Sequence, residues 1–169
     1  MTKKEIDHIL ARRSIRAYTN EPVSEEDTKA LLDAAMAAPS ASNRKPWHFI
    51  TVTNRSTLNA LAKVKQAAGM LEQAPLCIVP CGDASVSEGY WVQDVSAATE
   101  NILLAAAALD LGSVWIGIHP IEDRVKPVKE ILGIPKGIIP LCLIAIGHPA
   151  EEKEPRTQYD VSRVHREKW

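Results

Sequence analysis

The stretch AATENILLAAAALDLGSVWIGI, residues 97–118, decides the fold class of this chain. Its first half consists mostly of strong helix formers and is apolar on nearly every side, as is typical of a helix buried all round. Gly112 follows this helix, and the segment from Val114 to Ile118 has the β-branched and aromatic residues that favour a strand. A buried helix over residues 90–111 that leads into a strand indicates a layered domain containing both helices and a sheet.

The rest of the chain supplies the other elements of such a domain. Ser24 is placed to cap a helix that runs through Met36 and ends before Pro39, and Gly133 is placed to end another helix. The patterns predict further helices over 3–11, 55–68 and 121–132, and strands over 47–53, 76–79 and 138–146. This order predicts one layered α/β or α+β domain over residues 1–169, with helices on both faces of a central sheet.

Composition excludes several classes of protein. With 169 residues and a formal net charge of -1, the chain fits one domain and has no global attraction to nucleic acid or to an anionic membrane. The charged residues 1–8 do not form a secretory signal, and the apolar run from Ile102 to Leu109 is too short to span a bilayer. An odd set of three cysteines, Cys77, Cys81 and Cys142, argues against a disulfide framework. We therefore expect a soluble, cytoplasmic protein.

A cluster of cations follows the first predicted helix. Arg12, Arg13 and Arg16 stand within five positions together with Ser14. Guanidinium groups offer forked, permanently charged donors that match phosphate oxygens, so this turn is a candidate phosphate site. From spacing alone, a solvated basic turn is the commoner explanation of such a cluster.

Two further segments are candidates for binding a flat ligand. Residues 38–47, APSASNRKPW, form a stiff loop of small polar residues between two prolines, with exposed backbone donors and acceptors. Residues 112–117, GSVWIG, carry two glycines but lack the Lys-Ser/Thr ending of a phosphate loop. Each segment also fits an ordinary connection or core strand. No Gly-x-Gly-x-x-Gly occurs, which disfavours the common dinucleotide fold.

The sequence gives little support for a metal site or for a nucleophilic side chain. His119 and Asp123 stand four residues apart, but a lone pair is a weak indication of a metal site. Cys77 and Cys81 flank a predicted strand and fit buried thiols better than ligands. No Gly-x-Ser-x-Gly elbow or paired-carboxylate site stands out. We therefore predict no metal and no catalytic side chain.

Taken in order, the motifs resemble those of the nitroreductase superfamily, nearly from end to end. The resemblance rests on residues 12–16 (RRSIR), 38–43 (APSASN) leading into 46–49 (PWHF), the Ala-rich helix entering 112–117 (GSVWIG), 147–149 (GHP), and the ending 165–169 (HREKW). It implies an α+β fold with a mixed or antiparallel sheet, and an obligate, intertwined homodimer with two FMN sites at the interface. It also implies reduction by NADH or NADPH, followed by electron delivery to a flat nitroaromatic or quinone acceptor.

The resemblance also implies roles for particular residues. Arg12 and Ser14, beside Arg13, would hold the FMN phosphate, and Arg156 would reach it from the tail 150–169, which would wrap the partner subunit. Arg16 would stand near the pyrimidine edge of the flavin, where a fixed cation stabilises the negative charge of the reduced ring. The other subunit would contribute Pro39, Ser40, Ala41 and Asn43, and the second side of the ring would be lined by Trp115, Ile116 and Gly117.

The sequence departs from the family pattern at three places. Arg44 and Lys45 stand near positions where many members have glutamine, and two cations there would favour an anionic substrate or NADPH. The region after Gly69 is short, so Lys63, Lys65 or Gln66 would have to supply contacts to the flavin ring. The connection 83–90 is also short and would leave the site open. A flavin-binding sensor or store without turnover, and a member specialised for dehalogenation or flavin cleavage, are the alternatives.

Overall fold

The structure is a computed structural model that describes residues 3–155 and 157–169. Its α-helices are α1 (Lys3–Ala11), α2 (Glu25–Met36), α3 (Arg55–Leu61), α4 (Trp91–Ala108) and α5 (Glu122–Leu132), and three short 3₁₀ helices are η1 (Ala41–Asn43), η2 (Gln66–Glu72) and η3 (Val161–Arg163). The strands are β1 (Trp47–Val52), β2 (Leu76–Asp83), β3 (Gly112–Gly117), β4 (Ile138–Pro140) and β5 (Cys142–Gly147).

One antiparallel sheet forms the centre of the molecule. Its strands follow the order β1-β2-β5-β3, and the short strand β4 pairs with β2 off this path. Every strand pairing is antiparallel, which confirms an α+β fold. The order leaves β3 at one edge of the sheet, opposite β1 at the other.

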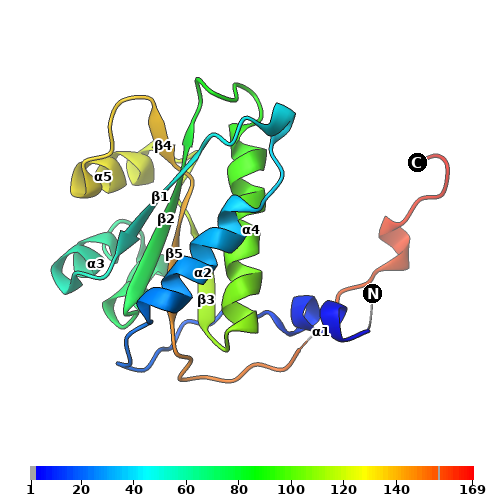
Figure 1. Cartoon of the computed structure of the whole chain (residues 1–169), viewed down its shortest axis with the longest axis horizontal. Coiled ribbons are helices and arrows are strands. Elements are labelled where there is room, and N and C mark those ends of the chain that lie inside the picture. Colours follow the sequence, from blue (N-terminus) through cyan, green and yellow to red (C-terminus); the bar gives the residue numbers. More distant parts are fainter. Residues whose placement is uncertain (1–2, 156) are drawn as a thin grey trace.

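Helices cover both faces of this sheet, as expected from the sequence (Figure 1). On one face α2 and α4 form a core with side chains of the sheet that include Ile78, Ile144 and Ile146. On the other face α3, η2 and α5 pack against Val79, Val114 and Leu143. The long helix α4 is buried along one side, at Val95, Ala98, Ile102 and Ala106, and belongs to the core there. Val92 and Ala108 are exposed, so the expected burial on every side is not met within one chain.

Two predicted helix ends are confirmed. The side chain of Ser24 accepts a hydrogen bond from the backbone N–H of Asp27 and so caps α2, which ends at Met36. Gly133 ends α5 in the left-handed conformation, with φ of 63°, where an L side chain would be disfavoured.

The single helix predicted over 55–68 is wrong. The structure has α3, a turn in which Lys65 is extended at φ of -157°, and then η2. The guanidinium of Arg55 donates to the carbonyls of Leu71, Glu72 and Ala74 at 2.8–3.0 Å. A continuous helix would carry Leu71 roughly 24 Å from Arg55, at about 1.5 Å per residue. The chain therefore folds back, and these contacts hold it there.

Two predicted strands have different limits, and both differences lie around Pro80. The strand predicted over 76–79 continues through Pro80 to Asp83, while the one predicted over 138–146 is broken at Leu141. Pro80 has no N–H, and it lies where the pairing of β2 changes from β5 to β4. Its carbonyl accepts a 2.9 Å hydrogen bond from the N–H of Leu141, so the break in one strand faces the proline in the other.

After β5 the chain runs along the lower end of the body and then leaves it (Figure 1). Residues 157–169 extend away from the sheet and contain only the single turn η3. Large apolar side chains on this segment are exposed: Tyr159, Val161, Val164 and Trp169. Within the described chain, no helix combines the length and hydrophobicity needed to cross a membrane.

Candidate functional site

The segment carrying the first cation cluster runs beside the edge strand β3. Ser14 forms a parallel bridge with Ser113, and the N–H of Ile15 donates to the carbonyl of Ser113 at 3.0 Å. Gly112 permits this close approach, because a Cβ there would lie 2.6 Å from Cγ2 of Ile15. The buried hydroxyl of Tyr18 donates to the carbonyl of Ile15 at 2.6 Å, and burial raises the pKa of Tyr18.

A small cavity of about 170 Å³ opens at this junction, and its lining holds three cations and the two acids Asp110 and Glu151. Its lining includes Arg12, Arg13, Ser113 and Lys153. We call these residues, together with Ser14 beside them, the basic cradle. Glu100 of α4 lies 3.5 Å from Nε of Arg12, and both side chains are partly exposed. The cradle therefore gathers three cations from segments more than 130 residues apart in the sequence.

Lys153 and Glu151 tie the segment after β5 to the cradle. The ammonium of Lys153 donates to the carbonyl of Ser14 at 2.7 Å and to Oε1 of Glu151 at 2.9 Å. The same carboxylate oxygen accepts from the N–H of Arg16 at 2.5 Å. This backbone N–H, and then Lys153, hold the pKa of Glu151 below its ordinary value. Arg13 donates to the carbonyl of Glu154, further along the same segment.

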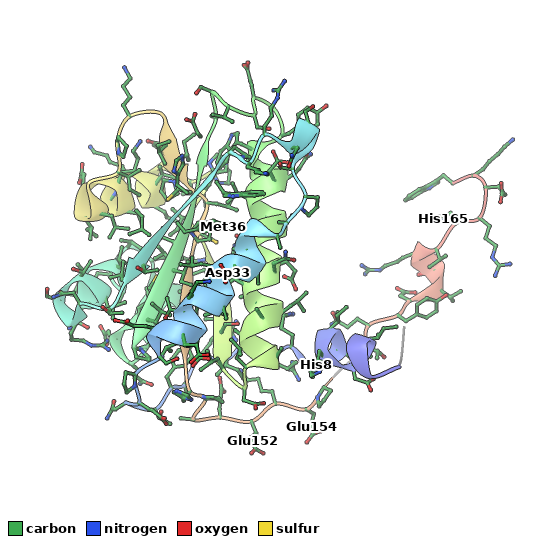
Figure 2. All side chains as sticks on the ribbon, in the orientation of Figure 1. His8, Asp33, Met36, Glu152, Glu154 and His165 are labelled. Atoms are coloured by element: carbon green, nitrogen blue, oxygen red, sulfur yellow. The ribbon has the colours of Figure 1, made fainter. Side chains whose placement is uncertain are left out.

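Sequence reasoning missed Lys153, and the reason is visible in its surroundings. It stands among the acids of residues 151–154, which resemble a solvated charged tail. In Figure 2 the side chains of Glu152 and Glu154 point away from the sheet, so the acids on either side of Lys153 face outward. Arg16 is exposed and does not line the cavity, and Arg156 lies outside the described residues.

The second predicted motif is a loop held against the start of α4. The N–H of Ala41 donates to Oδ1 of Asp94 at 2.8 Å, and the hydroxyl of Ser87 donates to Oδ2 at the same distance. The hydroxyl of Ser40 accepts from the N–H of Lys45 at 2.9 Å. Asp94 is 5% exposed and was missed, because an acid in the first turn of a helix has an ordinary explanation in the helix dipole.

The structure does not bring this loop to the basic cradle of the same chain. The loop contacts Asp94 in the first turn of α4, whereas the cradle cavity touches Ala107 in its last turn. The two positions are roughly 20 Å apart along the helix, at about 1.5 Å per residue. Figure 1 shows the loop and the chain after α1 at opposite ends of α4.

The third motif forms the outer edge of the sheet. In β3, Trp115 and Gly117 are partly exposed, while the side chain of Ile116 is buried in the core. Among the described residues, no atom outside the adjoining chain lies within 4 Å of a Cβ built on Gly117. The edge is therefore open beside Gly117, and Ile116 can offer only its backbone there.

His119 and Asp123, the weak metal indication in the sequence, are not part of a cluster of possible ligands. Across residues 3–155 and 157–169, no three His, Cys, Asp or Glu side chains gather where they could hold a metal ion. The ring of His119 packs edge-on against Trp91, with centroids 4.8 Å apart, and burial lowers the pKa of His119.

The chemistry of these groups fits FMN, the cofactor that the resemblance implies. Arg12, Arg13 and Lys153 are charged donors of the kind that bind a phosphate monoester. The open edge at Gly117 leaves room for a flat ring. On an antiparallel α+β fold, these features are those expected of a site for a flat cofactor that carries a phosphate.

The chain belongs to the nitroreductase family, whose model matches residues 9–68 and 58–148. It is 45% identical over 166 residues to a protein of Methanothermobacter thermautotrophicus provisionally named NADH dehydrogenase/NAD(P)H nitroreductase, covering 97% of this chain and 87% of the relative. A solved structure from Parabacteroides distasonis, provisionally given the same name, matches with a TM-score of 0.97 and 39% identity over 99% and 100% of the two chains. An FMN-dependent nitroreductase from Clostridium difficile matches with a TM-score of 0.92 and 32% identity over 97% and 99%.

Proposed function

We propose that this protein is an FMN-dependent NAD(P)H oxidoreductase of the nitroreductase type. It takes a hydride from NADH or NADPH and passes electrons to a flat acceptor such as a nitroaromatic compound or a quinone. The observation that carries this proposal is the basic cradle, in which Arg12, Arg13 and Lys153 surround a cavity beside an open sheet edge. Membership of the nitroreductase family and the similarity to an FMN-dependent nitroreductase support it.

The chain's own residues bind and orient the cofactor. Arg12, Ser14 and Arg156 would hold the phosphate, with Arg13 and Lys153 beside them. Trp115, the backbone of Ile116, and Gly117 would line the ring. When bound, FMN supplies the hydride acceptance and the electron delivery. The exposed cation of Arg16 would stabilise negative charge on the reduced ring and so raise its reduction potential.

A homodimer completes each site in this proposal. Pro39, Ser40, Ala41 and Asn43 of one subunit cover the ring held by the other, because they lie far from the cradle of their own chain. The exposed apolar side chains of the tail, such as Tyr159 and Trp169, pack on the partner subunit. An apolar groove between α1, α2 and α4, lined by Ile9, Ala34 and Leu104 among others, adds to the interface. We place this dimer in the cytoplasm, where its cysteines stay reduced.

A spectrum and a kinetic pattern test the proposed function together. The purified protein should be yellow and should release FMN, not FAD, on heating. Oxidation of NADH or NADPH with a quinone should give parallel double-reciprocal lines, because donor and acceptor use one flavin face in turn. A colourless protein that ignores added FMN would exclude the proposal. A yellow protein without turnover would instead favour a flavin store or sensor.

A further inference from the structure

A second and larger cavity lies where the turn before η2 approaches the first turn of α5. Its volume is about 540 Å³, and its lining is Val64, Lys65, Gln66, Ala67, Ile121, Asp123 and Arg124. It is next to the open end of β3, because Arg124 donates a long hydrogen bond of 3.4 Å to the carbonyl of Gly117. The cavity is therefore beside the position proposed for the flavin ring.

Two partly buried cations face this cavity. Lys65 and Arg124 are both half-buried, and among the described residues no carboxylate lies within ion-pair distance of either. Asp123 also lines the cavity and offsets one of the two charges. Lys63, another candidate from the sequence, is exposed and does not line it.

The break between α3 and η2 places Lys65 here. Residue 65 is extended, and the chain after it is held by the three hydrogen bonds from Arg55 to the end of η2 and the residues that follow. The position of this cation therefore depends on the packing of two elements, and not on a surface side chain alone.

We propose that this cavity, the anion subsite, binds the carboxylate or phosphate oxygens of a substrate beside the flavin ring. The proposal rests on the proposed function. A partly desolvated cation without a carboxylate partner gains most from an anion that supplies charge-assisted hydrogen bonds. The phosphate of FMN is not the anion in question, because the basic cradle lies beside Gly112, at the other end of β3 from Gly117. The two ends are roughly 17 Å apart, at about 3.3 Å per residue.

The test compares charged substrates with neutral ones that carry the same reacting group. Para-nitrobenzoate is paired with nitrobenzene as acceptor, and NADH is paired with N-benzyl-dihydronicotinamide as donor. Stopped-flow measurement of each half-reaction, per bound FMN, gives the selectivity of kcat/KM for the charged member of each pair. The variants are Lys65→Gln and Arg124→Gln, alone and together, with Lys126→Gln as a control that removes an exposed charge from α5.

We expect the double variant to lose about tenfold or more of this selectivity in at least one half-reaction. Loss with the acceptor pair identifies a carboxylated acceptor as the source of the anion, and loss with the donor pair identifies the phosphates of the dinucleotide. Lys126→Gln should keep the wild-type ratio. Asp123→Asn should shift it the other way, because a competing carboxylate is removed.

Unchanged ratios in both half-reactions would overturn the anion subsite. So would unchanged ratios accompanied by loss of bound FMN, because the two cations would then serve the cofactor. These outcomes differ from failure of the proposed function, in which the wild-type protein itself would lack FMN or fail to turn over either member of a pair.

Discussion

The backbone N–H of Ala41 donates a 2.8 Å hydrogen bond to the buried carboxylate of Asp94. The second oxygen of that carboxylate accepts from the hydroxyl of Ser87. One side chain therefore holds two loops against the first turn of α4, and its charge is favourably placed at the positive end of the helix. This contact fixes the loop 39–43, which the proposed dimer presents to the flavin of its partner.

Replacing Asp94 should release this loop and lower stability together. We expect Asp94→Ala to lower the free energy of unfolding by about 1–3 kcal/mol, because the buried hydroxyl of Ser87 and the partly buried N–H of Ala41 lose their acceptor. Hydrogen exchange at the N–H of Ala41 should become faster. Asp33→Ala is a matched control, since Asp33 is exposed and among the described residues its side chain pairs only with Lys29 on the same helix, a contact worth about 0.5 kcal/mol or less. Equal effects of the two substitutions would contradict the role given to Asp94.

A substitution of Gly112 tests the close contact between β3 and the segment of residues 12–16. Gly112→Ala would place a Cβ 2.6 Å from Cγ2 of Ile15, so one of the two segments must move. Overpacking of this kind should lower stability by about 1–3 kcal/mol, measured as a fall in Tm, and should weaken FMN binding through the cradle. Gly69→Ala is the control, because among the described residues its added Cβ meets no atom within 4 Å. A Tm for Gly112→Ala equal to that of the wild type would show that the segments adjust freely.

Arg12 tests the phosphate site directly. Arg12→Ala removes a charge-assisted contact, so FMN affinity should fall about tenfold or more, a loss of about 1.5–3 kcal/mol. Glu100→Gln should keep or improve affinity, because Glu100 lies 3.5 Å from Nε of Arg12 and competes for its charge. Lys29→Ala controls for net charge on an exposed helix surface. Unchanged affinity of Arg12→Ala in a fluorescence titration would show that this arginine is only a solvated surface group.

Local patterns predicted much of this architecture because they depend on neighbours in the sequence. The Ser24 cap, the Gly133 stop and the buried face of α4 each follow from residues within a few positions. The break at Lys65 and the interrupted strand at Leu141 do not. They depend on Arg55 reaching the end of η2 and on Pro80 facing a gap in the ladder, which are contacts between distant segments.

The candidate site, too, was predictable only where its residues are neighbours in the sequence. The cluster at Arg12 was visible because its members are adjacent in the sequence. Lys153, Asp94 and Arg124 were not, because each becomes informative only once a distant segment packs beside it. Of the three side chains proposed to supply missing flavin contacts, the structure directs Lys65 and Gln66, and not Lys63, toward a cavity.

The buried thiols give a pH dependence with a definite sign. Burial raises the pKa of Cys77 and of Cys81 to about 12, and it also raises the pKa of Cys142. The native state therefore keeps thiols protonated that the unfolded state releases near their ordinary pKa of 9.0. The stability that comes from keeping these thiols protonated is fully present below the unfolded-state pKa of 9.0. It is lost as the pH rises from 9.0 toward about 12, by about 1.4 kcal/mol per pH unit for each thiol.

Two measurements check this prediction. Urea unfolding should give a free energy of unfolding that falls between about pH 9 and about pH 11. A thiol reagent at neutral pH should leave the folded protein unlabelled and should label all three cysteines after unfolding. Rapid labelling of the folded protein, or stability that rises over this alkaline range, would contradict the burial of these side chains.

The tail tests the proposed dimer, and two truncations separate its contributions. Deleting residues 159–169 removes the exposed Tyr159 and Trp169 but keeps Lys153, Glu151 and Arg156. We expect weaker dimers and, as subunits separate, weaker FMN binding, because the loop 39–43 of the partner is lost from each site. Deleting residues 150–169 should weaken FMN binding further, because it also removes the cations of the tail.

Light scattering with absorbance detection measures mass and bound flavin in the same sample over a dilution series. An obligate interface of this kind should bury about 2,000 Å² or more in total, so the intact protein should remain dimeric at low concentration. The substitution Lys168→Ala near the end of the intact tail controls for the loss of charge alone. A truncated monomer that keeps stoichiometric FMN would refute the shared site while leaving the fold intact, because each subunit would then hold a complete site of its own.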